Sequence, residues 1–321
     1  MCFSKTVSMK PIHSLYETKL EEYATRHKEN IGHAALELHA RDRRIPLAGN
    51  PLLMGILNIN DDSFAGDGRL DADWALARAV EMVSEGADII DVGGESARTN
   101  RAAISEEEEL ARIRPFLENF SRAMRAARPR TDSQVFPPLL SLNTWRPNVV
   151  KGALTTGFDI LNDMSALPSE TNAIHCASIG AALLIMHSKG EPKIAHKHIT
   201  YPDVMDELLN FFREKTAIAL HSGVKRESLI LDPGIDFAKQ APDNLRIYRE
   251  LEKLTTLGFP ILLPVSRKSV IGRVLGIERP QDRDAGTIAC IVAGCLRGAS
   301  IFRIHNVSAA WFAIRTAEVL Q

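Results

Sequence analysis

Short apolar runs alternate with amphipathic stretches along the chain from residue 51 onward. Each run is apolar at consecutive positions and is short enough for a strand, which is typical of strands buried on both faces. The pattern therefore predicts eight buried strands: LLMGILN (52–58), ADIIDVGG (87–94), LLSLN (139–143), FDILND (158–163), ALLIMH (182–187), LILD (229–232), PILLPVS (260–266) and ASIFRIH (299–305).

Helical patterns fill most of the intervals between these runs. In DADWALARAVEMVSEG (71–86), apolar residues lie largely along one helical face, and Gly86 is expected to end the helix. SEEEELARIRPFLENF (105–120) opens with a capping box formed by Ser105 and Glu108. Similar helices are expected in the stretches 204–223 and 285–299.

Eight repeats of strand and helix predict a parallel (β/α)₈ TIM barrel. A doubly wound open sheet is the alternative, but no GxGxxG motif follows any of the runs. The charged, helix-forming segment at the start of the chain lies outside this pattern. We therefore expect an N-terminal helical extension over residues 1–48 and a barrel domain over residues 49–321.

The charge balance excludes some classes of partner. The chain has 39 basic and 40 acidic residues and a formal net charge of −1, which argues against nucleic acid or an anionic membrane as a partner. No apolar stretch approaches the roughly 18 residues of a membrane-spanning helix, and the first residues lack the apolar core of a secretory signal. The four cysteines are scattered without CxxC spacing. A cytoplasmic protein acting on small molecules is expected.

Nearly every predicted strand ends on a polar or charged side chain. In a TIM barrel these ends meet at one face, where binding sites are built, so the sequence predicts a polar pocket there. The strand ends and the residues directly after them include Asn58, Glu95, Asn143, Asn162, Asp163, His187, Asp232, Ser266, Arg267, Lys268, Arg303 and His305.

The residues at these ends suggest two kinds of binding chemistry. Asn143, Asn162 and Asp232 offer amides and a carboxylate, which suit a flat heterocycle with a guanidine-like edge. The cations are suited to a phosphate or diphosphate. The alternative is that they are surface residues at the ends of the strands without a binding role. Alternation along the last strand favours the pocket, because residues two apart share one face. The cationic candidates are Arg98, Lys268, Arg303 and His305.

The loop NINDDSFAGDGR (58–69) is rich in oxygen ligands. Asn58 with Asp61, Asp62 and Asp67 could supply oxygens to a Mg²⁺ ion that bridges phosphate oxygens. Acidic, glycine-rich loops are common, so this loop alone is weak support for a metal site.

Several ordered motifs together resemble the dihydropteroate synthase family over roughly residues 51–310. The motifs are MGILNINDDSF, EGADIIDVGGESAR, LNDMSAL, LLIMH, LILDPGIDFAK, SRKSVIG and FRIHNV. The resemblance implies a TIM barrel that joins 6-hydroxymethyl-7,8-dihydropterin diphosphate to p-aminobenzoate, with Mg²⁺ and release of pyrophosphate, in folate biosynthesis. It also implies a homodimer.

The resemblance assigns roles to residues by their place in these motifs. Asp232, Lys268, Arg303 and Asn143 would be the catalytic residues. Asn162, Asp232 and Lys268 would read the pterin, with Met186 and Phe237 as the walls of its pocket. Arg98, Arg303 and His305 would hold the diphosphate with Asn58, which would also touch the metal. Phe64 and Ser269 would receive p-aminobenzoate.

Four motifs depart from the usual family pattern. Asn143 replaces an aspartate of the pterin pocket, so we expect a slower or altered reaction rather than lost binding. The other departures lie in loops: Asn60 and Asp61 stand for Thr-Pro, Ala97 and Thr99 stand for Thr and Pro, and Asp236 stands where a glycine is common.

These departures leave two other functions open. A pterin-dependent methyltransferase would share the barrel and the pterin pocket, but it would not need the anion-binding set of Arg98, Arg303 and His305. A pterin-binding protein without catalytic activity is the second alternative, and Asn143 is the residue that supports it best.

Overall fold

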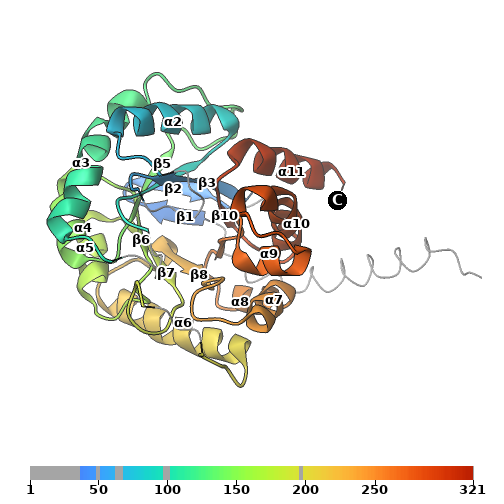
Figure 1. The fold of residues 1–321 in the computed structure, drawn as a ribbon. Helices are drawn as coiled ribbons and strands as arrows, with labels where there is room; N and C mark the ends of the chain where they lie inside the picture. Colours follow the sequence, from blue (N-terminus) through green and yellow to red (C-terminus); the bar gives the residue numbers. More distant parts are fainter. Residues whose placement is uncertain (1–36, 48–50, 62–67, 97–101, 195–197, 321) are drawn as a thin grey trace, which may run out of the picture.

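Eight parallel strands form the barrel at the centre of the molecule (Figure 1). The computed structural model describes residues 37–47, 51–61, 68–96, 102–194 and 198–320. The barrel strands are β3 (Leu52–Asn58), β4 (Ile89–Gly93), β5 (Leu139–Asn143), β6 (Ile160–Asp163), β7 (Ala182–Met186), β8 (Leu229–Asp232), β9 (Leu262–Leu263) and β10 (Ile301–Ile304). All eight lie within the predicted apolar runs.

The ends of the sheet meet and close it into a barrel. The hydrogen-bonded order is β8-β7-β6-β5-β4-β3-β10-β9, and every pairing is parallel. A single parallel bridge between Leu231 and Ile261 links β8 to the residue before β9, and the Leu231 amide donates to the Pro260 carbonyl at 2.9 Å. The predicted (β/α)₈ barrel is therefore confirmed.

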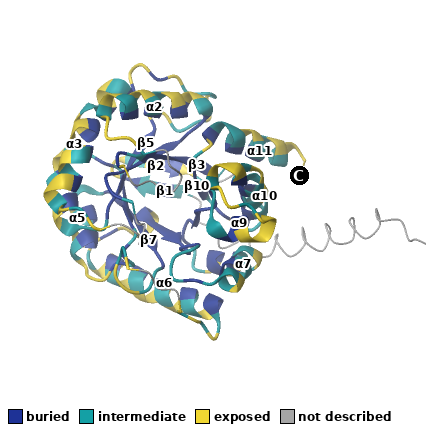
Figure 2. Cartoon of the chain, viewed as in Figure 1, coloured by how far each residue is buried: buried dark blue, intermediate teal, exposed yellow. Residues whose placement is uncertain are grey.

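Helices surround the barrel, with their buried faces toward the strands and their exposed faces outward (Figure 2). No helix within the described ranges is long and apolar enough to cross a membrane. The helices are α2 (Ala72–Glu85), α3 (Glu106–Ala123), α4 (Pro147–Ala153), α5 (Thr171–Ile179), α6 (Val204–His221), α7 (Ala241–Arg249), α8 (Glu252–Thr255), α9 (Ser269–Leu275), α10 (Asp284–Cys295) and α11 (Val307–Val319).

Local signals in the sequence set the ends of two helices. The Ser105 hydroxyl accepts the Glu108 amide at 3.1 Å and so caps α3, as the capping-box pattern predicts. Helix α2 ends at Gly86, whose φ of 113° lies in a region that L-residues with a side chain rarely adopt.

The barrel interior is divided into an apolar part and a polar part. Side chains alternate between the interior and the helices, so residues two apart along a strand face the same way. Nearer the amino ends of the strands the interior is apolar, with Ile89, Leu139, Ile160, Ile230 and Ile301 in one cluster. Two residues further along these strands stand Asp91, Ser141, Asn162, Asp232 and Arg303. The same alternation that fills the core thus places polar groups at the carboxyl ends.

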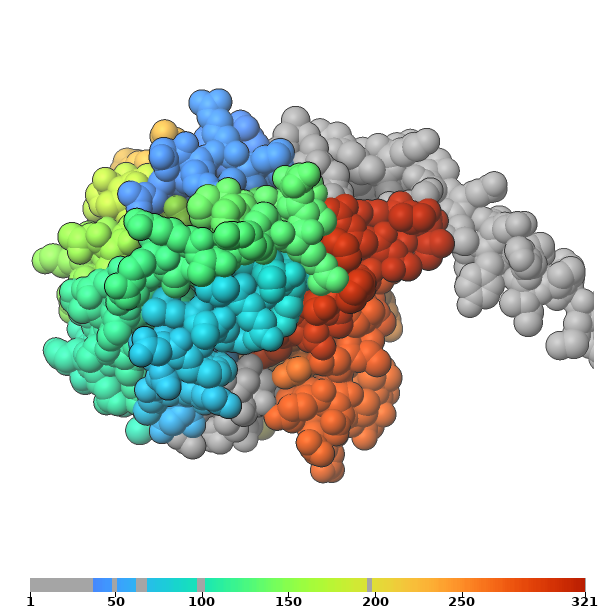
Figure 3. Space-filling view, turned by 90° about the horizontal axis from the view of Figure 1, so that it is seen from above, coloured from blue at the N-terminus to red at the C-terminus, as the bar shows by residue number. Residues whose placement is uncertain are grey.

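An antiparallel hairpin covers the apolar end of the barrel. Strands β1 (Glu37–Ala40) and β2 (Arg43–Pro46) pair with each other, and Leu38, Ala40 and Ile45 join the apolar interior cluster. In Figure 3 the hairpin (blue) forms the surface at the top of the view. The expected helix is therefore wrong for residues 37–46, where apolar side chains at alternate positions favour strands. Residues 1–36 of the expected extension lie outside the described residues.

Candidate active site

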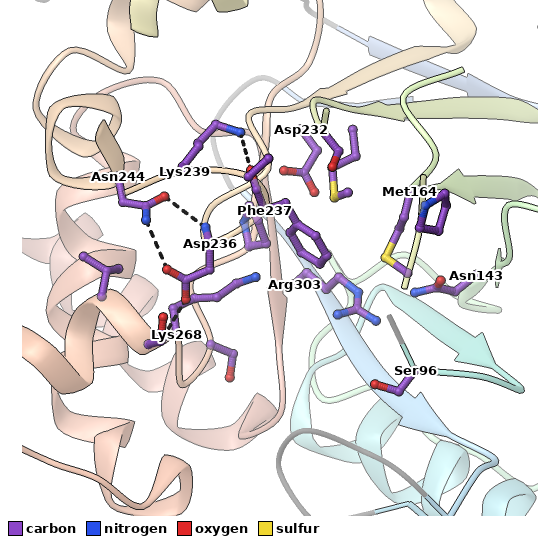
Figure 4. A pocket seen from close by; sticks show the side chains of 18 of the residues that line it. Ser96, Asn143, Met164, Asp232, Asp236, Phe237, Lys239, Asn244, Lys268 and Arg303 are labelled. Carbon is purple, nitrogen blue, oxygen red and sulfur yellow. Dashed lines mark hydrogen bonds between the residues drawn. The ribbon is translucent and has the colours of Figure 1, made fainter. Parts of the chain in front are cut away.

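A cavity of about 630 Å³ lies at the end of the barrel where the strands finish (Figure 4). Asn143, Asn162, Asp232 and Arg303 of the polar interior line it, together with residues of the loops that follow β4, β7, β8 and β9. This is the end at which sites are built in TIM barrels, because the strand-to-helix loops converge there.

Most of the predicted site residues meet in this cavity. Ten of the twelve line it: Asn58, Asn143, Asn162, Met186, Asp232, Phe237, Lys268, Ser269, Arg303 and His305. The other two, Arg98 and Phe64, lie outside the described residues. The heterocycle-binding candidates and the cationic candidates therefore share one cavity, as the strand-end pattern predicts.

Asp232 is a buried carboxylate at the end of β8. It is 4% exposed, and among the described residues the Gly234 amide is the one donor to its carboxylate, at 2.7 Å from Oδ1. Burial raises the pKa of Asp232 to about 6, although the charges of Lys268, Lys239 and Arg303 act against this rise. Its other oxygen has no hydrogen bond to these residues and is available to a ligand in the cavity.

Buried Lys239 holds the loop that carries Asp232. Its Nζ donates to the carbonyls of Gly234 and Phe237, both at 3.0 Å, and lies 2.8 Å from His187 Nδ1. Burial lowers the pKa of Lys239 to about 7. Burial and the charge of Lys239 lower the pKa of His187 to about 2, so His187 is a neutral acceptor. The chain passes so close here that a Cβ on Gly234 would lie 2.0 Å from the His187 carbonyl oxygen. These contacts keep Phe237 at the cavity.

Asp91, in the middle of β4, connects several of the site residues. Its fully buried carboxylate accepts hydrogen bonds from Ser141 Oγ at 2.6 Å, Asn143 Nδ2 at 3.1 Å and Asn162 Nδ2 at 3.2 Å, and pairs with Arg303 Nε at 2.7 Å. The sequence reasoning missed this residue. The signal was a lone acid inside an apolar run, since a buried charge needs partners from neighbouring strands.

Asn143 has an unused acceptor at the cavity. Its Nδ2 donates to Asp91, whereas its Oδ1 is buried and has no hydrogen-bond partner within the described residues. Buried polar atoms normally find a partner, so an unpaired oxygen at a cavity wall is a candidate acceptor for an N–H of a ligand. Asn143 thus offers an uncharged acceptor, and its Nδ2 donates to the buried carboxylate of Asp91.

The cations are held by neighbouring loops. Lys268 Nζ donates to the Ile235 carbonyl at 3.0 Å and lies 5.0 Å from the centre of the Phe237 ring, and burial lowers its pKa. The hydroxyl of Ser266 lies 2.7 Å from His305 Nδ1 and accepts the His305 amide at 3.1 Å. Because both loops are fixed by such bonds, the cavity presents cationic groups in set positions.

Buried ion pairs join the loops after β4, β5 and β7. Glu95 lies 3.1 Å from Lys193 Nζ and 2.6 Å from Arg146 Nη1, and Arg146 also pairs with the buried Glu109. Lys193 donates in addition to the Ser96 carbonyl at 3.0 Å. Of these residues, only Glu95 is predicted from the sequence, as a strand-end residue, because charges far apart along the chain show no pairing pattern.

The residues at the end of β3 fit a magnesium ion only in part. Asn58 lines the cavity, but Asp61 is exposed and lies 3.6 Å from Arg112, while Asp62 and Asp67 fall outside the described residues. In the described part of the chain, no three His, Cys, Asp or Glu residues gather into a metal-binding group. Mg²⁺ is usually held by few protein ligands together with phosphates and water. The amide oxygen of Asn58 therefore suits Mg²⁺ when a substrate diphosphate supplies further oxygens.

Comparisons with known proteins identify the family. A profile of the pterin binding enzyme family matches residues 54–305. Dihydropteroate synthase of Bacillus subtilis is 35% identical over 272 residues, which are 84% of this chain and 88% of that protein.

Solved structures agree with this relationship. A dihydropteroate synthase of Yersinia pestis, described with a sulfonamide drug complex, has a TM-score of 0.79 at 33% identity and covers 88% of this chain and 98% of its own. One from Thermus thermophilus, in complex with 4-aminobenzoate, has a TM-score of 0.76 at 32% identity and covers 89% of this chain and 100% of its own. The chain therefore belongs to the dihydropteroate synthase family of pterin-binding enzymes.

Proposed function

We propose that this protein is a dihydropteroate synthase, a transferase of folate biosynthesis. It would join 6-hydroxymethyl-7,8-dihydropterin diphosphate to p-aminobenzoate and release pyrophosphate. The observation that carries the proposal is the placement of Asp232 and Arg303 in one cavity, with Lys268 and His305 beside them. Groups suited to a pterin and groups suited to its diphosphate therefore share one cavity.

The side chains of the cavity suit the two parts of the first substrate. Asp232 would accept N–H groups from the amino-pyrimidine edge of the pterin, and Asn143 and Asn162 would complete its hydrogen bonds. Met186 and Phe237 would form the walls. Arg303 and His305 would hold the diphosphate, together with Arg98, which lies outside the described residues.

The reaction needs positioning and charge stabilisation more than a nucleophile. As the bond between the methylene carbon and the diphosphate oxygen breaks, its electron pair leaves with pyrophosphate, and the pterin becomes electron-poor. Asp232 and Asp91 would favour that positive charge, while Arg303, His305 and Lys268 would favour the leaving group. The aniline nitrogen would then form the new C–N bond and lose a proton to water, with Phe64 and Ser269 receiving p-aminobenzoate.

A magnesium ion would assist at the diphosphate. Asn58 would hold it through its amide oxygen, with the remaining ligands from substrate oxygens and water. The bound ion would supply positive charge that stabilises the departing pyrophosphate. The expectations of a homodimer and of a cytoplasmic location stay predictions.

Turnover of the purified protein tests this function. Protein, Mg²⁺, the pterin diphosphate and p-aminobenzoate should yield dihydropteroate and pyrophosphate in equal amounts. Tight binding of the pterin without any turnover would instead identify a non-catalytic pterin-binding protein. Methyl transfer to a corrinoid protein, without use of p-aminobenzoate, would support the methyltransferase alternative.

Pterin binding should weaken in acid because Asp232 must be ionised to accept N–H groups. Its pKa is about 6, so the carboxylate becomes protonated as the pH falls through that value. The dissociation constant of a pterin without phosphates should be nearly constant above about pH 7 and rise by up to about tenfold per pH unit below about pH 5.5. Fluorescence titration from about pH 5 to pH 8 measures it. An equal rise in an Asp232→Asn variant would assign the effect to another group.

Asn143→Asp should speed the reaction. A carboxylate at residue 143 adds negative charge beside the electron-poor pterin, and a charged contact is worth roughly 1.5–3 kcal/mol, so kcat should rise about tenfold or more. Asp91 already lies next to the amide, at 3.1 Å, and a like charge so close raises the pKa of the introduced carboxylate. The gain should therefore increase as the pH rises and the proton is lost.

The matched control at this position is Asn143→Ala, which removes the hydrogen bond to Asp91 without adding charge. Steady-state kinetics at about pH 6 and pH 8 should show a fall in kcat for this variant. A fall in both variants, with the fold intact, would show that an amide at residue 143 suits the reaction better than a carboxylate.

A further inference from the structure

Asp236 joins the loop after β8 to two helices at the side of the cavity. Its Oδ1 accepts the Asn244 side chain at 3.1 Å, and its Oδ2 accepts the Ser269 amide at 2.5 Å (Figure 4). Its own amide donates to Asn244 Oδ1 at 2.9 Å. Asp236, Asn244 and Ser269 all line the cavity. The carboxylate is therefore part of the binding site and is held there by both helices.

The backbone at Asp236 favours a different residue type. Its φ of 69° lies in the left-handed region, which glycine adopts freely and which strains most other residues. A glycine here would relieve that strain, but it would leave the Ser269 amide and the Asn244 side chain without these partners. The aspartate thus makes contacts that a glycine cannot make.

The carboxylate changes the charge of this side of the cavity. Lys268 is the cation next to it. Burial lowers the pKa of Lys268, and among the nearby charges Asp236 does most to raise it again. Its Oδ2 also occupies the Ser269 amide, a donor that an incoming anion could otherwise use. Arg273 lines the same region but is exposed, so water screens its charge. An anionic group of a ligand in this region would meet the carboxylate of Asp236, and the Ser269 amide would already be hydrogen-bonded.

We infer that Asp236 is a specificity-determining residue that weakens binding of the carboxylate of p-aminobenzoate relative to an uncharged aromatic amine. This inference rests on the proposed function, in which Ser269 receives p-aminobenzoate, and it places the carboxylate of that substrate beside Ser269 and Asp236. Asp236 lowers the affinity for p-aminobenzoate by charge repulsion and by holding the Ser269 amide. An uncharged analogue such as 4-aminobenzamide lacks the repelled group and is not affected in this way.

Two variants and two amines test the inference. Asp236→Asn keeps the shape of the side chain and tolerates the left-handed backbone, whereas Asp236→Gly removes the side chain and the strain. In both, KM for p-aminobenzoate should fall about tenfold, as expected for loss of a nearby like charge, while KM for 4-aminobenzamide should change by less than about threefold. Asp243→Asn is the matched control, since Asp243 caps α7 and does not line the cavity. Its KM values should stay within about twofold of the parent values.

Direct binding of both amines, measured by calorimetry, separates this inference from the proposed function. If no variant turns over but p-aminobenzoate binds the Asp236 variants more tightly than the parent, the inference holds and the synthase proposal fails. If the parent turns over but p-aminobenzoate binds all variants equally, the inference is overturned and the synthase proposal stands. Absence of p-aminobenzoate binding in every variant, or equal gains for both amines, also overturns it.

Discussion

Arg303→Met should lower kcat/KM for the pterin diphosphate by about 10³-fold and also destabilise the fold. The guanidinium would bind the diphosphate, so its removal weakens both binding and stabilisation of the leaving group. In the protein itself, Arg303 pairs with Asp91 at 2.7 Å, and Asp91 is fully buried. Removing one partner of a buried pair leaves an uncompensated charge, and the free energy of unfolding should fall by about 3–5 kcal/mol. Denaturant unfolding and steady-state kinetics measure the two effects.

A double variant separates these two roles of Arg303. Adding Asp91→Asn to Arg303→Met removes the stranded charge, so most of the lost stability should return. Activity should not return, because the contact to the diphosphate is still missing. Recovery of activity in the double variant would mean that Arg303 acts only by neutralising Asp91. Unchanged stability in Arg303→Met would mean that the pair contributes little to the fold.

Asp232→Asn should lower kcat/KM by about 10²–10³-fold and leave the protein at least as stable as before. The amide cannot accept two N–H groups from the pterin edge and carries no charge to stabilise the electron-poor ring. Stability should respond in the opposite direction. The pKa of Asp232 is raised from 3.8 to about 6, so ionisation of this carboxylate opposes folding.

The size of this stability effect depends on pH. The unfavourable ionisation of Asp232 is absent below about pH 4, grows as the pH rises to about 6 and is constant above that. At about pH 8 the Asn variant should therefore gain about 1–3 kcal/mol in the free energy of unfolding, and near about pH 4 it should gain nothing. Thermal or denaturant unfolding at both pH values measures this. A loss of stability at pH 8 would show that Asp232 supports the fold as well as the site.

The fold and the cavity could be predicted because both follow from periodic patterns. Continuous apolar runs mark strands buried on two faces, and a parallel barrel brings all their carboxyl ends together. Asp232 and Arg303 could therefore be placed in one cavity from sequence alone, although they are 71 positions apart in the chain.

The features that were missed depend on contacts between distant parts of the chain. Asp91 lies inside an apolar run, and its partners come from three other strands. Lys239 looks like a loop cation in the sequence, but three carbonyls and His187 surround it in the fold. The many charged residues in and before positions 37–46 favour a helix in the sequence analysis. The structure is a hairpin, because alternate residues are buried under the barrel.

The single bridge between Leu231 of β8 and Ile261, the residue before β9, gives the barrel a seam, and that seam runs beside the cavity. Asp232 ends the strand on one side of it, and Lys268 follows the strand on the other. A pterin bound to both residues, as proposed, would cross the seam and link its two edges. Bound substrate should therefore stabilise the barrel against local opening along this seam.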